Sequence, residues 1–106
     1  HMKKNDKIYF MEKAVKVRKV WRKKIPAITH IDNTARVQTV NKSINPIFYD
    51  LISEFYKITK TPVLLNTSFN LNGEPIVCSP KDAIRTFFSC GLDILVLGNF
   101  IIKKND

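Results

Sequence analysis

The spacing of apolar residues is most regular between residues 45 and 60, where it follows the period of an α-helix. Asn45 is a typical N-cap, and Pro46 suits the first turn because its missing N–H would have no partner there. Pro62 blocks any continuation. Apolar side chains recur three and four residues apart and share one helix face, which we expect to lie in the core: Ile47, Phe48, Leu51, Ile52, Phe55 and Ile58.

A second helix is predicted to begin after Ser79. Serine is a good N-cap, Pro80 suits the first helical position, and Asp82 places a carboxylate in the first turn. Gly91 is expected to close this helix. The residues expected to face inward are Ala83, Ile84, Phe87 and Phe88.

Segments rich in β-branched and aromatic residues alternate with these helices. The dipeptide Gly98-Asn99 between two of them is the signal of a two-residue hairpin. A switch to helical spacing at Val17, Val20 and Trp21 predicts one or two helical turns before Pro26. The segments expected to form strands are 8–17, 35–40, 63–65, 94–97 and 100–103.

This order of elements predicts an α+β fold in which helices pack on a mixed, twisted sheet. A chain of 106 residues with 44% apolar residues forms at most one domain with one core. No run of eighteen apolar residues occurs, so we expect no membrane span and a cytoplasmic location. Cys78 and Cys90 lack metal-ligand spacing, which predicts free, buried thiols in a reducing compartment.

Positive charge is concentrated at the start of the chain. Residues 1–24 contain ten lysines and arginines against Asp6 and Glu12, so they carry +8 of the formal net charge of +9. Such a cluster could attract nucleic acid, although a solvated basic face is the commoner outcome. His1-Met2 has the form of a vector remnant.

The candidate chemistry lies in the segment that follows residues 63–65. Small polar side chains occur at Asn66, Thr67, Ser68 and Asn70, directly after an apolar run expected to be a buried strand. Ligands tend to sit at the ends of such strands. A polar turn whose side chains satisfy only the local backbone is the alternative, and the residue types do not decide between the two.

Arg36 is the second candidate for ligand binding. It is the only arginine between Arg22 and Arg85, and Asp32 is its only nearby carboxylate. Its planar fork of donors would suit a phosphate, and a surface pair with Asp32 is the alternative. His30 is a weaker candidate, since a lone histidine is more often structural.

The usual signatures of catalytic sites are absent. The sequence has no GxSxG, Walker loop or HExxH motif, and neither cysteine has an adjacent base. An arginine, small hydroxyls and amides remain, and these groups position and stabilise phosphates rather than exchange protons. The residues therefore predict anion or nucleotide binding near residues 66–70.

From Ile25 to Lys104 the chain resembles the C-terminal domain of the antibiotic and nodulation-factor O-carbamoyltransferases. Residues 66–75 also resemble the Thr-Ser-Ala-Asn-x-Ser-Gly-x-Pro signature of the YrdC family, with Phe69 in place of alanine. The matching segments are THIDNTARVQTV (29–40), TPVLLNTSFNLNGEPIVCSPKDAIRTF (61–87) and LDILVLGNFIIKK (92–104).

The resemblance implies a partial YrdC-like domain over residues 25–106, preceded by a basic strand and short helix in residues 1–24. Such domains make carbamoyl adenylate from carbamoyl phosphate and ATP, and the resemblance leaves open a Mg²⁺ ion with the ATP. A separate N-terminal Kae1-like domain then transfers the carbamoyl group to a hydroxyl. By position in the family motif, Ser68 and Asn70, together with Asn66, would contact the phosphate region of the adenylate. Arg36 would hold a phosphate or the carbamoyl group, and His30 would be its neighbour.

The chain also departs from the family pattern. An arginine- and lysine-bearing stretch upstream of the first strand is missing, so we expect the isolated chain to bind ligand weakly and to catalyse nothing. Asn33 replaces a frequent glycine, and both residues tolerate a left-handed turn. One alternative is a basic YrdC-like RNA-binding module without catalysis, although nucleic acid is not the expected partner; another is a purely structural domain.

Overall fold

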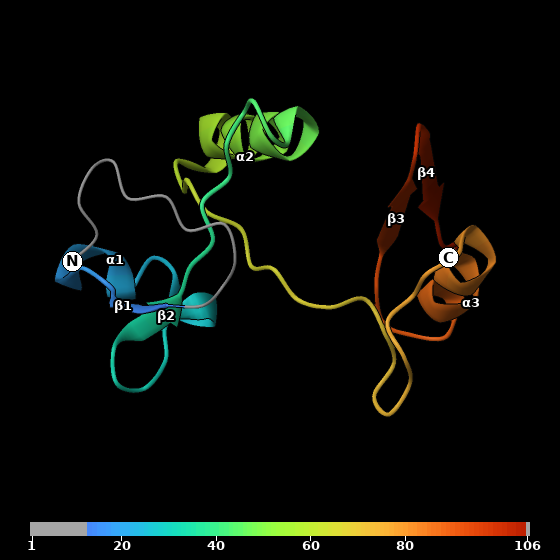
Figure 1. Ribbon diagram of the computed structural model, residues 1–106, viewed down its shortest axis with the longest axis horizontal. Helices are drawn as coiled ribbons and strands as arrows, with labels where there is room; N and C mark the ends of the chain where they lie inside the picture. The colour runs from blue at the N-terminus through green and yellow to red at the C-terminus, as the bar shows by residue number, and fades with distance from the viewer. Residues whose placement is uncertain (1–12, 106) are drawn as a thin grey trace. The chain divides into compact units, whose positions relative to one another are not determined.

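The computed structural model describes residues 13–105 and shows an α+β chain in two compact units, the first ending at Leu65 and the second beginning at Asn66 (Figure 1). The α+β class is therefore confirmed. Its elements are β1 (Ala14–Lys16), α1 (Lys19–Arg22), a 3₁₀ turn (Pro26–Ile28), β2 (Thr34–Arg36), α2 (Pro46–Thr59), α3 (Pro80–Phe88), β3 (Ile94–Leu97) and β4 (Phe100–Lys103).

Two short strands hold the start of the first unit together. β1 pairs antiparallel with β2, and Ala35 on β2 is only 2% exposed. The turn before β2 is closed by the His30 N–H, which donates to the Thr34 carbonyl at 2.7 Å. Asn33 in this turn has a φ of 63°, the left-handed conformation expected of an asparagine in a glycine position.

α2 confirms the helix predicted between residues 45 and 60. The Asn45 side chain accepts a hydrogen bond from the Phe48 N–H at 3.2 Å, as an N-cap does. Lys60 ends the helix in a left-handed conformation with a φ of 59°. No residue of α2 is buried, so the expectation that its apolar face lies in a core is wrong for the described chain. The three-residue strands β1 and β2 are too short to cover a helix of 14 residues.

The core of the second unit lies between α3 and the β3–β4 hairpin. Ala83, Phe87 and Leu95 are buried, and Phe69, Val77, Leu97 and Ile102 pack against them. The predicted cap of α3 is confirmed, since the Ser79 hydroxyl accepts from the Asp82 N–H at 3.1 Å. Gly98 has a φ of 59°, which the predicted two-residue hairpin needs at its first loop position.

Two inward-facing residues of α3 were predicted wrongly. Ile84 is 39% exposed and Phe88 is 57% exposed, whereas Thr86 is buried. A helix of nine residues against one hairpin buries a narrow stripe, and that stripe passes through residues 83, 86 and 87. α3 also ends at Phe88, before Gly91.

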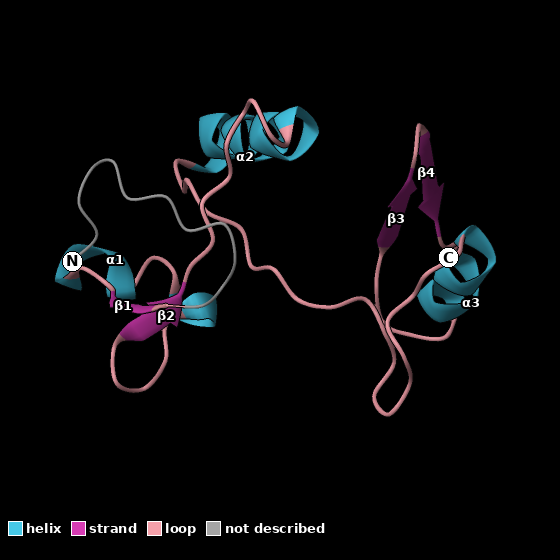
Figure 2. Cartoon of the chain, viewed as in Figure 1, coloured by secondary structure: helices cyan, strands magenta, loops and turns pink. Residues whose placement is uncertain are grey.

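The predicted strands 94–97 and 100–103 are confirmed as β3 and β4, whereas the other predicted strands are shorter than expected or absent. Residues 63–65 and 37–40 are not strands, and Figure 2 shows loop between α2 and α3. In place of one mixed sheet, the described strands form two separate antiparallel pairs. A strand needs a neighbour for its backbone hydrogen bonds, and the described chain offers none to residues 63–65. Residues 8–12 of the predicted first strand lie outside the described range.

The two thiols are free, as expected, but they are not both buried. Cys78 is exposed and Cys90 is half-buried. Cys78 immediately precedes Ser79, the N-cap of α3. The expectation of buried thiols is therefore wrong for Cys78.

Candidate functional site

The predicted binding segment forms a folded loop in the second unit. The Val77 N–H donates to the Phe69 carbonyl at 2.9 Å, and the Glu74 N–H donates to the Leu71 carbonyl at 3.0 Å. Gly73 occupies the tight part of the turn with a φ of 80°, where a side chain would be strained. The Val77–Phe69 bond joins the two ends of the segment 69–77, which we call the clasp loop, and the Glu74–Leu71 bond closes the turn within it.

The Asn70 side chain closes the clasp loop from within. Its Nδ2 donates to the Glu74 carbonyl at 3.0 Å and to the Leu71 carbonyl at 3.1 Å. The sequence left open a turn in which polar side chains bond only to the local backbone. The Asn70 amide nitrogen forms bonds of this kind.

An ion pair connects the clasp loop to α3. Arg85 Nη2 lies 3.0 Å from Glu74 Oε2, and Nη1 lies 3.5 Å from Oε1, so the pairing is two-pronged. The hydrogen bond and charge of Glu74 raise the pKa of Arg85 above its ordinary value. Both side chains are partly open to solvent, which limits what the pair adds to stability.

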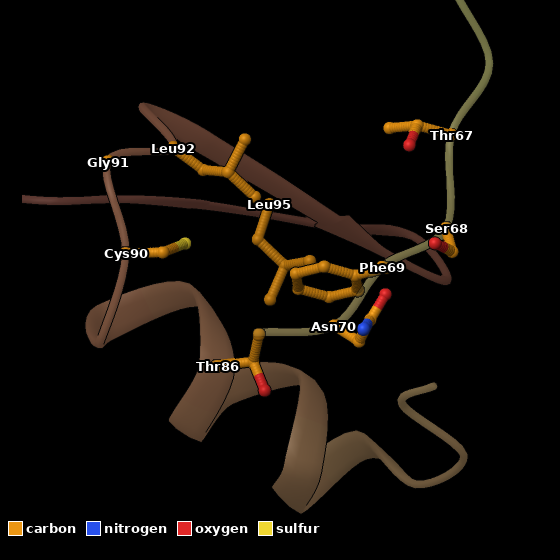
Figure 3. Close-up of a pocket in the computed structure, with 9 residues that line it drawn as sticks. All are labelled: Thr67, Ser68, Phe69, Asn70, Thr86, Cys90, Gly91, Leu92 and Leu95. Atoms are coloured by element: carbon orange, nitrogen blue, oxygen red, sulfur yellow. The ribbon is translucent and has the colours of Figure 1, made fainter. Parts of the chain in front are cut away.

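An open hollow of about 520 Å³ lies between the start of this loop, α3 and the hairpin. Figure 3 shows Ser68 and Asn70 on one side of it, and Thr86 and Cys90 on the side of α3. Its size is within the range of small-molecule sites. The residues lining it are Thr67, Ser68, Phe69, Asn70, Thr86, Cys90, Gly91, Leu92 and Leu95.

Most of the wall is apolar, and its polar atoms are concentrated on the loop. Thr67 and Ser68 are exposed at the hollow, and neither hydroxyl has a hydrogen-bond partner among residues 13–105. Lys104, which does not line the hollow, donates from Nζ to the carbonyl of Cys90 and lies 4.9 Å from the centre of the Phe87 ring. The hollow thus combines an apolar surface with the exposed hydroxyls of Thr67 and Ser68, which can bind a ligand.

Sequence reasoning placed Ser68 and Asn70 in the site but did not find its other wall. Thr86, Cys90 and Leu92 come from the end of α3 and the turn after it. The four-residue spacing of Thr86 and Cys90, which follows a helical period, was the one available signal. Asn66 is exposed and adjacent to the site, but it does not line the hollow.

The remaining candidates, Arg36 and His30, belong to the first unit. Arg36 is the last residue of β2 and is exposed. Among residues 13–105 no ion pair joins it to a carboxylate, so the alternative of a pair with Asp32 is not observed. His30 is exposed, and its backbone closes the turn before β2.

Asp32 instead stabilises that turn. Its Oδ1 accepts from the Thr34 hydroxyl at 2.7 Å and from the Thr34 N–H at 3.0 Å. These two hydrogen bonds are the main reason why the pKa of Asp32 lies below its ordinary value of 3.8. The guanidinium of Arg36 is thereby left without a carboxylate from this turn.

Residues 13–105 contain no group of three or more His, Cys, Asp or Glu side chains that could hold a metal ion. Within that range, no helix has both the length and the apolar character needed to cross a membrane. The groups at the hollow are suited to binding by hydrogen bonds and apolar contact.

Comparison with known proteins adds independent information. A family model described as carbamoyltransferase C-terminus matches residues 1–104. The chain is 52% identical over 95 residues to nodulation protein NolO of Bradyrhizobium diazoefficiens, a match that covers 90% of this chain and 17% of NolO. It is 41% identical over 73 residues to the 3'-hydroxymethylcephem-O-carbamoyltransferase of Amycolatopsis lactamdurans, covering 69% of this chain and 14% of that enzyme.

A third relative, an uncharacterized protein of Synechocystis, is 53% identical over 83 residues, which are 78% of this chain and 14% of that protein. The chain thus spans 14% to 17% of the length of these three relatives.

Proposed function

The chain belongs to the carbamoyltransferase C-terminus family, and on that premise we propose that it serves the adenylate-forming step of an O-carbamoyltransferase. In this proposal ATP and carbamoyl phosphate are the substrates, and carbamoyl adenylate is the product. The observation that carries it is the hollow at Ser68, where free hydroxyls meet an apolar wall. Such a surface offers hydrogen bonds to a phosphate and apolar contact to a base.

The phosphate end of the ligand would lie at the loop. The Ser68 hydroxyl donates to a phosphate oxygen, with Asn66 and Asn70 on either side of it. Hydrogen bonds to a charged group are worth about 1.5–3 kcal/mol each, more than those between neutral groups. Because no histidine or carboxylate of residues 13–105 lines the hollow, the site would act by orientation and charge stabilisation.

Arg36, in the first unit, would supply positive charge for the phosphate or the carbamoyl group. Its exposed guanidinium, which no carboxylate of residues 13–105 pairs, can bind a phosphate or a carbamoyl oxygen in two-pronged fashion. His30 would lie beside it on the turn before β2. Mg²⁺ would accompany the ATP, held by phosphate oxygens more than by protein.

The transfer step would belong to another part of the protein. Because the chain spans less than a fifth of the three relatives' length, we propose an N-terminal Kae1-like domain that passes the carbamoyl group to a hydroxyl acceptor. The complete gene product would then be the active enzyme, and the isolated chain would be inactive.

The test uses the complete gene product and measures carbamoyl adenylate formed from carbamoyl phosphate and ATP. Ser68→Ala and Arg36→Ala should each lower this rate about 10- to 100-fold, the effect of one lost charge-assisted hydrogen bond. Ser53→Ala is the matched control, because its hydroxyl only bonds the Tyr49 carbonyl on α2. Wild-type rates in both Ser68→Ala and Arg36→Ala would refute the proposal.

A further inference from the structure

We propose that Asn70 and Arg85 are positioning residues that hold the clasp loop, and that, within the segment 67–70, the phosphate is bound by the hydroxyls of Thr67 and Ser68. This inference rests on the proposed function for the identity of the ligand, but its structural part does not. It adds Thr67 to the site and assigns to Asn70 a role different from direct phosphate contact.

The donors of Asn70 are already in use. An amide nitrogen carries two hydrogens, and Nδ2 donates to two carbonyls, those of Leu71 and Glu74. What remains is the acceptor Oδ1, which has no partner among residues 13–105. Phosphate oxygens also accept, so Asn70 cannot bind them without opening the turn that it closes.

The hydroxyls of Thr67 and Ser68 have the opposite properties. Both line the hollow, both are exposed, and neither is engaged within the described chain. A hydroxyl rotates to donate wherever an acceptor lies. In Figure 3 the two residues lie together at the start of the loop, just before Phe69. They are therefore the free donors of this segment.

Arg85 is already paired with a carboxylate of the clasp loop. Two of its terminal nitrogens face the two carboxylate oxygens of Glu74. Glu74 is also the residue whose carbonyl accepts from Asn70. One residue of the clasp loop is thus held twice, by Asn70 through its backbone and by Arg85 through its side chain, and the second contact fixes the loop to α3.

These contacts connect the clasp loop to the binding residues. Phe69 follows Ser68 directly, packs against the core and accepts the Val77 N–H. If the loop opens, Phe69 loses this bond, and the backbone that carries Thr67 and Ser68 loses its anchor. Asn70 and Arg85 would therefore affect ligand binding through loop geometry, without touching the ligand.

The first test measures amide hydrogen exchange at Glu74 and Val77, whose N–H groups form the loop's backbone bonds. In the complete gene product without ligand, Asn70→Ala should speed both exchanges about five- to tenfold, as loss of an ordinary hydrogen bond predicts. Arg85→Ala should speed them less, about twofold, because the ion pair is exposed. Ser68→Ala should leave both rates unchanged.

Two further variants separate the loop contact from a general loss of folding. The exchanged pair Glu74→Arg with Arg85→Glu should restore protection lost in Arg85→Ala. Lys81→Ala, on the exposed side of the same helix, is the matched control and should behave as wild type. Unchanged exchange at Glu74 and Val77 in Asn70→Ala would overturn the assignment of Asn70, whatever the activity.

The second test measures binding of carbamoyl phosphate and ATP by calorimetry. Thr67→Val with Ser68→Ala should lose binding while loop exchange stays normal, whereas Asn70→Ala should lose both. The double variant Asn70→Ala with Arg85→Ala should lose less binding free energy than the sum of the losses in the two single variants, because both residues hold the same loop. Additive losses with normal loop exchange would mean that Asn70 contacts the ligand itself, which overturns the inference.

The two tests also separate this inference from the proposed function. If wild type binds neither substrate but Asn70→Ala still loosens the loop, the function is wrong and the clasp assignment stands. If the wild type binds both substrates and the Thr67 and Ser68 variants bind them normally, the hydroxyl assignment is wrong.

Discussion

The strongest stability prediction concerns Phe87 and Phe88, adjacent residues of the same type on α3. The Phe87 side chain is fully buried, whereas Phe88 is 57% exposed. Phe87→Ala removes the largest side chain from the core formed with Ala83 and Leu95. Since phenylalanine-to-alanine changes in cores cost about 3–5 kcal/mol, we expect a loss of that order in the second unit.

Phe88→Ala is the matched control because the two rings share one contact. Their centres are 5.1 Å apart in an edge-to-face arrangement, so either substitution removes that interaction, worth about 0.5–1.5 kcal/mol. The difference between the unfolding free energies of the two variants therefore reports the effect of burying the Phe87 side chain. We expect Phe88→Ala to cost about 1 kcal/mol and Phe87→Ala at least twice as much.

The assay is urea unfolding of the chain, followed at the amide signals of β3 and β4. With a slope of about 1–3 kcal/mol per molar urea, a loss of 3 kcal/mol lowers the midpoint by about 1–3 M. Phe87→Leu, which keeps most of the apolar volume, provides a measurable variant if Phe87→Ala unfolds the unit completely. Equal midpoints for Phe87→Ala and Phe88→Ala would refute the buried core described here.

Two further predictions concern local contacts. Ser79→Ala should destabilise α3 by about 1 kcal/mol, measured by amide exchange in the helix, because the Asp82 N–H loses its cap; Ser79→Asp should retain most of the stability, and equal stability in Ser79→Ala would contradict the capping role. The turn at Asp32 should be fully stabilised above the ordinary pKa of 3.8 and should loosen as pH falls through the lower folded value. Chemical shifts of the Thr34 N–H from about pH 5 to pH 2 measure this, and Asp32→Asn should abolish the dependence.

Elements whose signals are local were predicted well. The caps at Asn45 and Ser79 were identified from residue type, and both hydrogen bonds are present. The hairpin at Gly98 was found in the same way, because a positive φ at one position restricts which residue can occupy it. Each of these features depends on contacts within a few residues.

Elements that depend on partners were predicted poorly. Residues 63–65 have the composition of a buried strand but form none, since no described strand lies beside them. Ile84 and Phe88 satisfy the helical spacing of a buried face, yet the hairpin covers only a narrower stripe. Apolar type indicates which residues can be buried, and only neighbouring elements decide which of them are.

The candidate site also combines features that local sequence indicates with features that depend on neighbouring elements. The polar residue types at 66–70 left a binding segment and a local turn open, and the resemblance to carbamoyltransferases, a family that the match confirms, added the substrate class as an expectation. The far wall at Thr86 and Cys90, and the occupation of both Asn70 donors, became visible only in the folded chain.

The sequence by itself determined the helices, their caps, the hairpin and the family, because these depend on short-range chemistry and on residue identity. The tertiary structure decided which donors remain free. An asparagine in a sequence has two hydrogens to offer, but in this fold those of Asn70 are held by the carbonyls of Leu71 and Glu74. The hydroxyls of Thr67 and Ser68 remain available, because the fold brings no acceptor of the described chain to them.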